Sequence, residues 1–131
     1  MMSALTFTNP ETLFTPPGYS HVVEAVGGRA IYVAGQVAID RSGAIVGVGD
    51  VEIQARQAFE NVGLALAAVG ADFRHVVKLV TFVTDVASAR AAFRAARDAY
   101  ITTTAPASTL VEVRRLFRDE LLIEVEAVAY L

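Results

Sequence analysis

The sequence has no cysteine, which excludes disulfide bonds, a thiolate metal site and a cysteine nucleophile. No apolar run approaches the roughly 20 residues of a membrane-spanning helix, and the first dozen residues lack the basic and apolar regions of a signal peptide. Charge is also scarce, with 19% charged residues against 54% hydrophobic ones. We therefore expect a cytoplasmic protein with no membrane partner that covers part of its apolar surface by self-association.

The charge balance is slightly acidic. The net charge of −3 contrasts with the basic domain that a general nucleic-acid binder normally has, so we expect no nucleic-acid partner. His21 and His75 are the two histidines, and neither has a partner at metal-ligand spacing, so we expect no metal site. A length of 131 residues fits a single domain, 1–131.

β-Forming runs fill the first part of the chain. Residues 20–26 and 29–37 flank Gly27-Gly28, which predicts a hairpin, because glycine tolerates the positive φ of a two-residue turn. A short strand near residues 4–7 and a proline-containing loop precede these runs.

Two segments have the apolar period of amphipathic helices. They span residues 50–69 and about 85–100, with Asp50 as the N-cap of the first and Asp85 or Ser88 as that of the second. Gln54 falls mainly off the apolar stripe of the first. Three arginines fall off the stripe of the second and are interpreted as a solvent-exposed face: Arg90, Arg94 and Arg97.

Further strands are predicted at 76–84, 108–114 and 122–131. Right-handed crossovers would place both helices on one side of a single sheet, which gives a two-layer sandwich. The other sheet face would carry Glu124 and Glu126 among apolar groups that are costly to expose, so it would lie against another subunit or a cleft. Those apolar groups are Leu110, Leu122, Val128 and Tyr130.

Five segments form a series along the chain: Gly18-Tyr19, Val33-Ala34-Gly35-Gln36, the helix segment 54–61, the strand segment 77–85, and 106–113 followed by 123–129. In this order they resemble the Rid family, the reactive intermediate deaminases also known as YjgF-like or endoribonuclease L-PSP-like proteins. The resemblance implies a chorismate-mutase-like α+β fold, with a mixed sheet of about six strands and two helices on one face. It also implies a homotrimer whose open sheet faces form a barrel, with small-molecule clefts between subunits.

In that family, enamines and imines such as 2-aminoacrylate are hydrolysed to keto acids and ammonia without a metal or organic cofactor. The resemblance assigns Glu124 to position or activate the hydrolytic water, although hydrogen bonding in the subunit or to a neighbour is a purely structural alternative for this residue. It assigns six residues to substrate binding: Tyr19, Ala34, Gly35, Phe93, Ser108 and Thr109.

Three of these positions depart from the family pattern. Ser108 stands where active deaminases have the arginine that grips the substrate carboxylate, Ala34 replaces a serine, and Phe93 replaces an asparagine. We therefore expect an enzyme that hydrolyses an imine, an enamine or a related reactive metabolite other than an amino-acid imine. A non-catalytic metabolite binder is the alternative, followed by an endoribonuclease or translation inhibitor.

Overall fold

The structure is a computed structural model that describes residues 4–103 and 105–131. Its described elements, in chain order, are β1 (Ala4–Thr8), β2 (Val22–Val26), β3 (Ala30–Gln36), α1 (Val51–Ala67), the 3-10 helix η1 (Phe73–His75), β4 (Val76–Val83), α2 (Val86–Tyr100), β5 (Ala107–Glu112) and β6 (Ile123–Tyr130). The predicted α+β class with two helices is confirmed. Asp50 and Asp85 are the N-caps, and each carboxylate accepts a hydrogen bond from the first turn of its helix.

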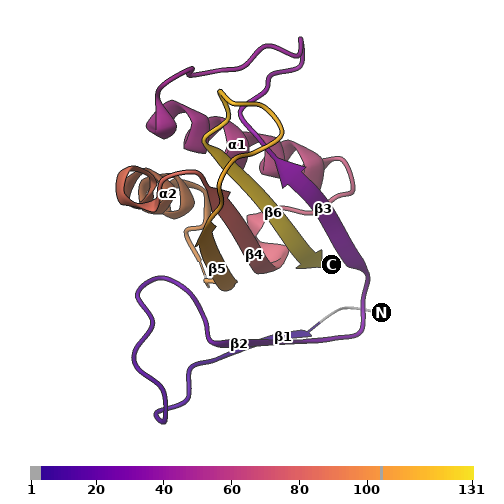
Figure 1. Cartoon of the computed structure of the whole chain (residues 1–131). Helices are drawn as coiled ribbons and strands as arrows, with labels where there is room; N and C mark the ends of the chain where they lie inside the picture. Colours follow the sequence, from indigo (N-terminus) through magenta and orange to yellow (C-terminus); the bar gives the residue numbers. More distant parts are fainter. Residues whose placement is uncertain (1–3, 104) are drawn as a thin grey trace.

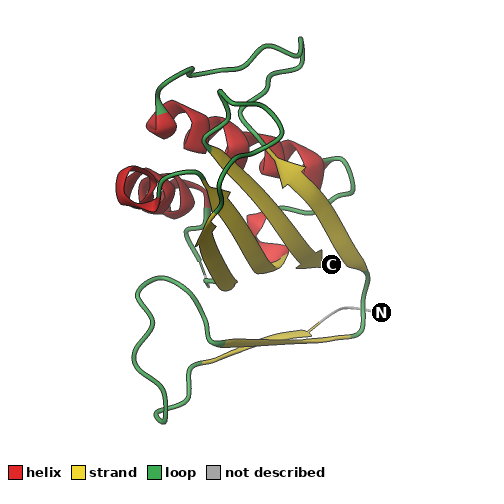
Figure 2. Cartoon of the chain, in the orientation of Figure 1, coloured by secondary structure: helices red, strands yellow, loops and turns green. Residues whose placement is uncertain are grey.

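Four strands form the main sheet, in the order β3-β6-β4-β5. β4 and β5 are parallel and joined through α2, whereas β6 is antiparallel to both of its neighbours. Both α-helices lie on the same side of this sheet (Figure 1), and no helix among the described residues covers its other face (Figure 2). We call this second face the open face. None of the described helices is long and apolar enough to cross a membrane.

The predicted hairpin across Gly27-Gly28 is wrong. β2 pairs instead with β1, from Ala4 opposite Val26 to Thr8 opposite Val22, and these two strands form a separate arm beside the main sheet (Figure 1). Both glycines do have positive φ, but the turn carries the chain into a different sheet, where β3 pairs with β6. Two β-rich runs around a glycine pair predict a turn well, but they do not determine the partner of either strand.

The core lies between the sheet and the two helices. The side of β6 that faces α1 alternates as predicted, with Ile123, Val125, Ala127 and Ala129 all buried. Phe59 of α1 is also fully buried, and its ring lies 5.9–6.2 Å from three other aromatic rings: Phe73, Phe93 and Tyr100. This aromatic contact fixes α2 against α1.

Gln54 was predicted to lie mainly off the apolar stripe of α1, but its side chain is fully buried. Its Nε2 donates to the carbonyl oxygens of Gly47 and Glu120, and its Oε1 accepts from the N–H of Leu122. These bonds tie α1 to the loop that enters β6. They explain how a polar side chain is buried without leaving its donors and acceptors unpaired.

Candidate functional site

A pocket of about 350 Å³ lies between α2 and the outer strand β5. It brings together Tyr19, Phe93 and Ser108, three of the residues predicted to bind substrate. Its remaining lining residues are Pro17, Val86, Arg90, Arg94, Arg97 and Leu110. We call this the α2 pocket.

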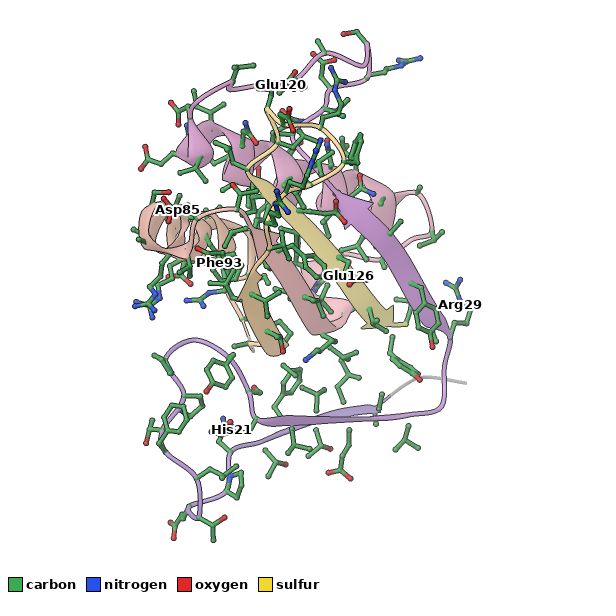
Figure 3. All side chains as sticks on the ribbon, viewed as in Figure 1. His21, Arg29, Asp85, Phe93, Glu120 and Glu126 are labelled. Carbon is green, nitrogen blue, oxygen red and sulfur yellow. The ribbon has the colours of Figure 1, made fainter. Side chains whose placement is uncertain are left out.

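The loop before β2 brings Tyr19 to this pocket. Ser20, the next residue, is buried and donates its backbone N–H to the carbonyl oxygen of Pro106 at 3.0 Å, directly before β5. The ring of Tyr19 also packs edge-on against His21, with a centroid distance of 5.3 Å. His21 itself lies in the β1–β2 arm (Figure 3) and is not among the residues that line the pocket.

Arg97 was interpreted as part of a solvent-exposed face, and this interpretation is wrong. The residue is only 8% exposed, and its Nε donates to Asp98 at 3.0 Å. It follows Phe93 by four positions, so the two side chains share one side of the helix, with the guanidinium 5.5 Å from the ring centroid. That spacing was the sequence signal for its burial.

The second group of predicted residues lies at the β3–β6 pair. Glu124 belongs to the open face, in register with Phe82 of β4 and in direct contact with Gly35 of β3. Ala34 and Gly35 are exposed, at the point where the β3–β6 register is irregular. Ala34 and Gly35 therefore belong to β3, the strand that lies next to the Glu124 carboxylate.

Burial raises the pKa of Glu124 above its ordinary value, and the nearby charge of Glu126 raises it further. Glu126 lies two residues along the same face of β6 (Figure 3). A carboxyl with a raised pKa exchanges a proton more readily near neutral pH than an ordinary glutamate does. Among the described residues, no group of three or more His, Cys, Asp or Glu side chains is placed to hold a metal ion.

Ser108 and Thr109 lie on opposite sides of β5, because successive side chains alternate along a strand. Ser108 lines the α2 pocket, whereas Thr109 accepts a hydrogen bond from the Nζ of Lys78 at 3.0 Å. Leu110, which was expected on the open face, instead lines the α2 pocket with Ser108. One small molecule bound to a single subunit therefore cannot contact both Ser108 and Thr109 directly.

The two groups are separated within one chain. β4 lies between β5 and β6, so these strands are about 10 Å apart, and the α2 pocket opens on the opposite side of the sheet from Glu124. The arginines after β5 contribute to neither group. Arg115 and Arg118 are exposed and pair with Asp119 and Glu120.

Comparison with known proteins gives consistent results. Residues 12–131 match the family model described as endoribonuclease L-PSP. A RutC family protein of Synechocystis is 36% identical over 114 residues, which cover 86% of this chain and 85% of that protein. The 2-iminobutanoate/2-iminopropanoate deaminase of Salmonella typhimurium is 38% identical over 106 residues, which cover 78% of this chain and 80% of that enzyme.

A solved structure is also similar over nearly the whole chain. It is that of YyfB, a protein of unknown function of the Rid family from Yersinia pestis, with a TM-score of 0.89 and 37% sequence identity. The superposition covers 97% of this chain and 98% of YyfB. Fold, family model and relatives agree, and the chain therefore belongs to the endoribonuclease L-PSP family, which includes the RutC and Rid proteins.

Proposed function

We propose that this chain is a hydrolase of the Rid type that deaminates an imine, an enamine or a related reactive metabolite, in clefts between the subunits of a homotrimer. The observation that carries the proposal is the division of the site residues into two groups. Tyr19, Phe93 and Ser108 lie at the α2 pocket, while Gly35 and Glu124 lie at the β3–β6 pair. Each group is half a site, and a neighbouring subunit would supply the other half.

The open face supports such an assembly. Tyr32 of β3 is 77% exposed and Val111 of β5 is 38% exposed, on a chain with few charges to cover apolar surface. Burial of each large apolar side chain is worth about 1.5–3 kcal/mol. Three open faces around a central axis would bury these side chains and bring Glu124 toward the α2 pocket of the next subunit.

The chemistry requires one proton-transfer group. Glu124 would accept a proton from water as the oxygen attacks the C=N carbon, and would pass that proton to the nitrogen to give a carbinolamine. The carbinolamine would then expel ammonia as its hydroxyl proton is transferred to the nitrogen, which leaves a carbonyl group. The raised pKa of Glu124 suits this exchange near neutral pH. Tyr19 and Phe93 would wall the cleft on the other side.

The test measures ammonia release from a panel of imines and enamines generated in the assay, by wild type, Glu124→Gln and Glu126→Gln. The panel includes 2-iminopropanoate and 2-iminobutanoate as the amino-acid imines expected to react poorly, and the variants are compared on the compound that the wild type hydrolyses fastest. Both substitutions remove one charge from the same strand face. We expect a loss of about a hundredfold or more for Glu124→Gln and little change for Glu126→Gln. Equal loss in both variants, or none in either, would contradict the role of Glu124.

A second function, metabolite binding without turnover, is favoured by Ser108. A serine hydroxyl is a single neutral donor, whereas the arginine expected at this position would pair with a substrate carboxylate through two hydrogen bonds. Saturable binding of keto acids with no ammonia release from any imine tested would support this second function.

A further inference from the structure

The α2 pocket has an uneven distribution of charge. Arg90, Arg94 and Arg97 follow one another at spacings of four and three residues, so all three lie on one side of α2, and all three line the pocket. No aspartate or glutamate is among the residues that line it. The whole chain has a net charge of −3, so this concentration of positive charge is local.

Arg97 is held in position from three sides. Asp98 accepts from its Nε, and the ring of Phe93 lies against its guanidinium. The chain at Gly18 packs so closely that a Cβ there would lie 2.8 Å from the Arg97 Cζ. Gly18 also has a φ of +94°, so this position favours glycine in both space and conformation.

The guanidinium of Arg97 retains hydrogen-bonding capacity. Within residues 4–103 and 105–131, its Nε has a carboxylate partner, but its two terminal nitrogens have no hydrogen-bond partner. The hydroxyl of Ser108 likewise donates to no described residue. The terminal nitrogens of Arg97 are not among the buried polar atoms without a partner, so they reach solvent at the pocket and can donate to a ligand that displaces water. The pocket is therefore organised in advance for an anion.

The charges indicate how many negative charges that anion carries. Three guanidinium groups surround the pocket, and Asp98 neutralises one of them, which leaves two positive charges. Arg90 and Arg94 line the same pocket and are exposed, so each is available to a second anionic group of a ligand held by Arg97. A monocarboxylate would leave one of these charges unmatched.

We propose that the α2 pocket binds a small molecule with two negative charges, a dicarboxylate or a phosphate ester, with Arg97 as the buried anchor and Ser108 as a neutral donor. This inference rests on the proposed function, because it names the substrate class that the same cleft would accept. Arginine from α2 then replaces arginine from β5 as the anion-binding group.

The test is titration calorimetry in low-salt buffer with malonate, inorganic phosphate and acetate as probes. We expect malonate or phosphate to bind the wild type at least about tenfold more tightly than acetate. Preference for malonate would identify a dicarboxylate ligand, and preference for phosphate a phosphate ester. Equal affinity for all three probes, or no binding of any, would overturn the proposal.

Variants locate the binding. Arg97→Met keeps much of the side-chain volume and should weaken dianion binding by about tenfold or more. Arg90→Ala and Arg94→Ala alter exposed positions and should each weaken it by about two- to fivefold. If Arg97→Met does not fold, the dianion affinities of Arg90→Ala and Arg94→Ala test the proposal instead. Arg56→Ala, which removes an exposed arginine from α1, is the matched control and should bind as the wild type does.

The same samples separate this inference from the proposed function. Arginine-dependent dianion binding without any imine hydrolysis would leave the inference standing and remove the catalytic proposal. Hydrolysis that depends on Glu124, together with dianion binding that is the same in all arginine variants, would support the catalytic proposal and overturn the inference about the α2 pocket.

Discussion

The carboxylate of Glu124 occupies the space that a side chain at Gly35 would fill, in the contact between β6 and β3. A Cβ at position 35 would overlap the carboxylate, and it would lie 2.7 Å from the Glu124 Cδ. The φ of Gly35 is not positive, so the backbone there does not require glycine. The close approach of the carboxylate is therefore the reason that glycine fits at this position.

Gly35→Ala should displace the Glu124 carboxylate and leave the fold intact. Because the carboxylate is partly exposed and flexible, it can move aside, and we expect little change in Tm. Hydrolysis of the substrate should fall by about ten- to a hundredfold, the cost of a misplaced catalytic group. The measurement is kcat and Tm for both proteins.

The double variant Gly35→Ala with Glu124→Gln is the control. If glycine acts only through Glu124, the double variant should be no slower than Glu124→Gln alone. Additive losses would mean that Gly35 contributes through another contact.

Glu124→Gln should stabilise the protein at neutral pH. The folded-state pKa of Glu124 is raised, so the folded state binds a proton more tightly than the unfolded state does. Stability from this group is therefore greatest below the unfolded-state pKa and is lost as the pH rises through the raised folded-state pKa. Glutamine does not ionise, so the Glu124→Gln variant avoids this loss of stability at neutral pH.

The measurement is thermal unfolding of the subunits at several pH values. The variant should have the higher Tm at about pH 7, and the difference should shrink as the pH falls below about 4. A Tm difference that is independent of pH would show that the effect comes from the shape of glutamine and not from the charge of Glu124.

The parts of the fold that follow from local pattern could be predicted from the sequence. The alternation of β6 was predicted correctly because each side chain reports directly on which face is buried. The two helices were predicted for the same reason, and their aspartate caps mark their starts. The pairing of β2 with β1 was not predicted, because the local pattern of a strand does not say which other strand it pairs with.

The site was harder to predict because burial of a charged side chain contradicts its average behaviour. Arg97 was assigned to solvent because it falls off the main apolar stripe and because arginine is mostly a surface residue, although it follows Phe93 by four positions and packs against that ring. Ser108 and Thr109 were both assigned to substrate binding from the family resemblance, although alternation along a strand places their side chains on opposite sides of β5. In both cases geometry was a better guide than residue type or resemblance.

Gln54→Ala should destabilise the fold by about 2–4 kcal/mol, because it removes the three hydrogen bonds of a fully buried side chain and leaves the N–H of Leu122 without its acceptor. Urea unfolding measures the change. Gln57→Ala is the matched control on the same helix, since Gln57 lies nearer the surface and, among the described residues, its side chain donates to Asn61 alone. The control should lose less than about 1 kcal/mol. Similar losses in the two variants would contradict a special role for Gln54.

Asp72→Asn should reduce stability only above acidic pH. The pKa of Asp72 is lowered to about 2, chiefly by its hydrogen bond from the Arg74 side chain. A lowered pKa contributes stability above the unfolded-state value, and this stability is lost as the pH falls toward the folded-state value. Asp72 is about half exposed, so solvent screening limits the contribution to less than about 1 kcal/mol.

Asparagine also caps helices well, so this substitution changes mainly the charge. The difference in unfolding free energy between the two proteins should be present at about pH 6 and mostly lost at about pH 2. In an Arg74→Ala background the pH dependence should be clearly smaller, because the side-chain hydrogen bond is the largest cause of the lowered pKa while the backbone hydrogen bond from residue 74 remains. An undiminished pH dependence there would assign the lowered pKa to another cause.

The last prediction concerns the proposed assembly through the open face. Tyr32 on the open face and Leu64 on α1 are both large and exposed, at 77% and 61%, but they lie on opposite sides of the molecule. In the proposed trimer, Tyr32→Glu would bury a charge against the neighbouring subunit. We therefore expect this variant to be monomeric and its hydrolysis to fall, because the proposed shared cleft would be lost. Leu64→Glu should leave both unchanged. Light scattering measures the mass of the assembly, and circular dichroism shows whether each variant is folded. A monomeric wild type would refute a cleft built from two subunits. A Tyr32→Glu variant with the oligomer mass and the activity of the wild type would refute it as well.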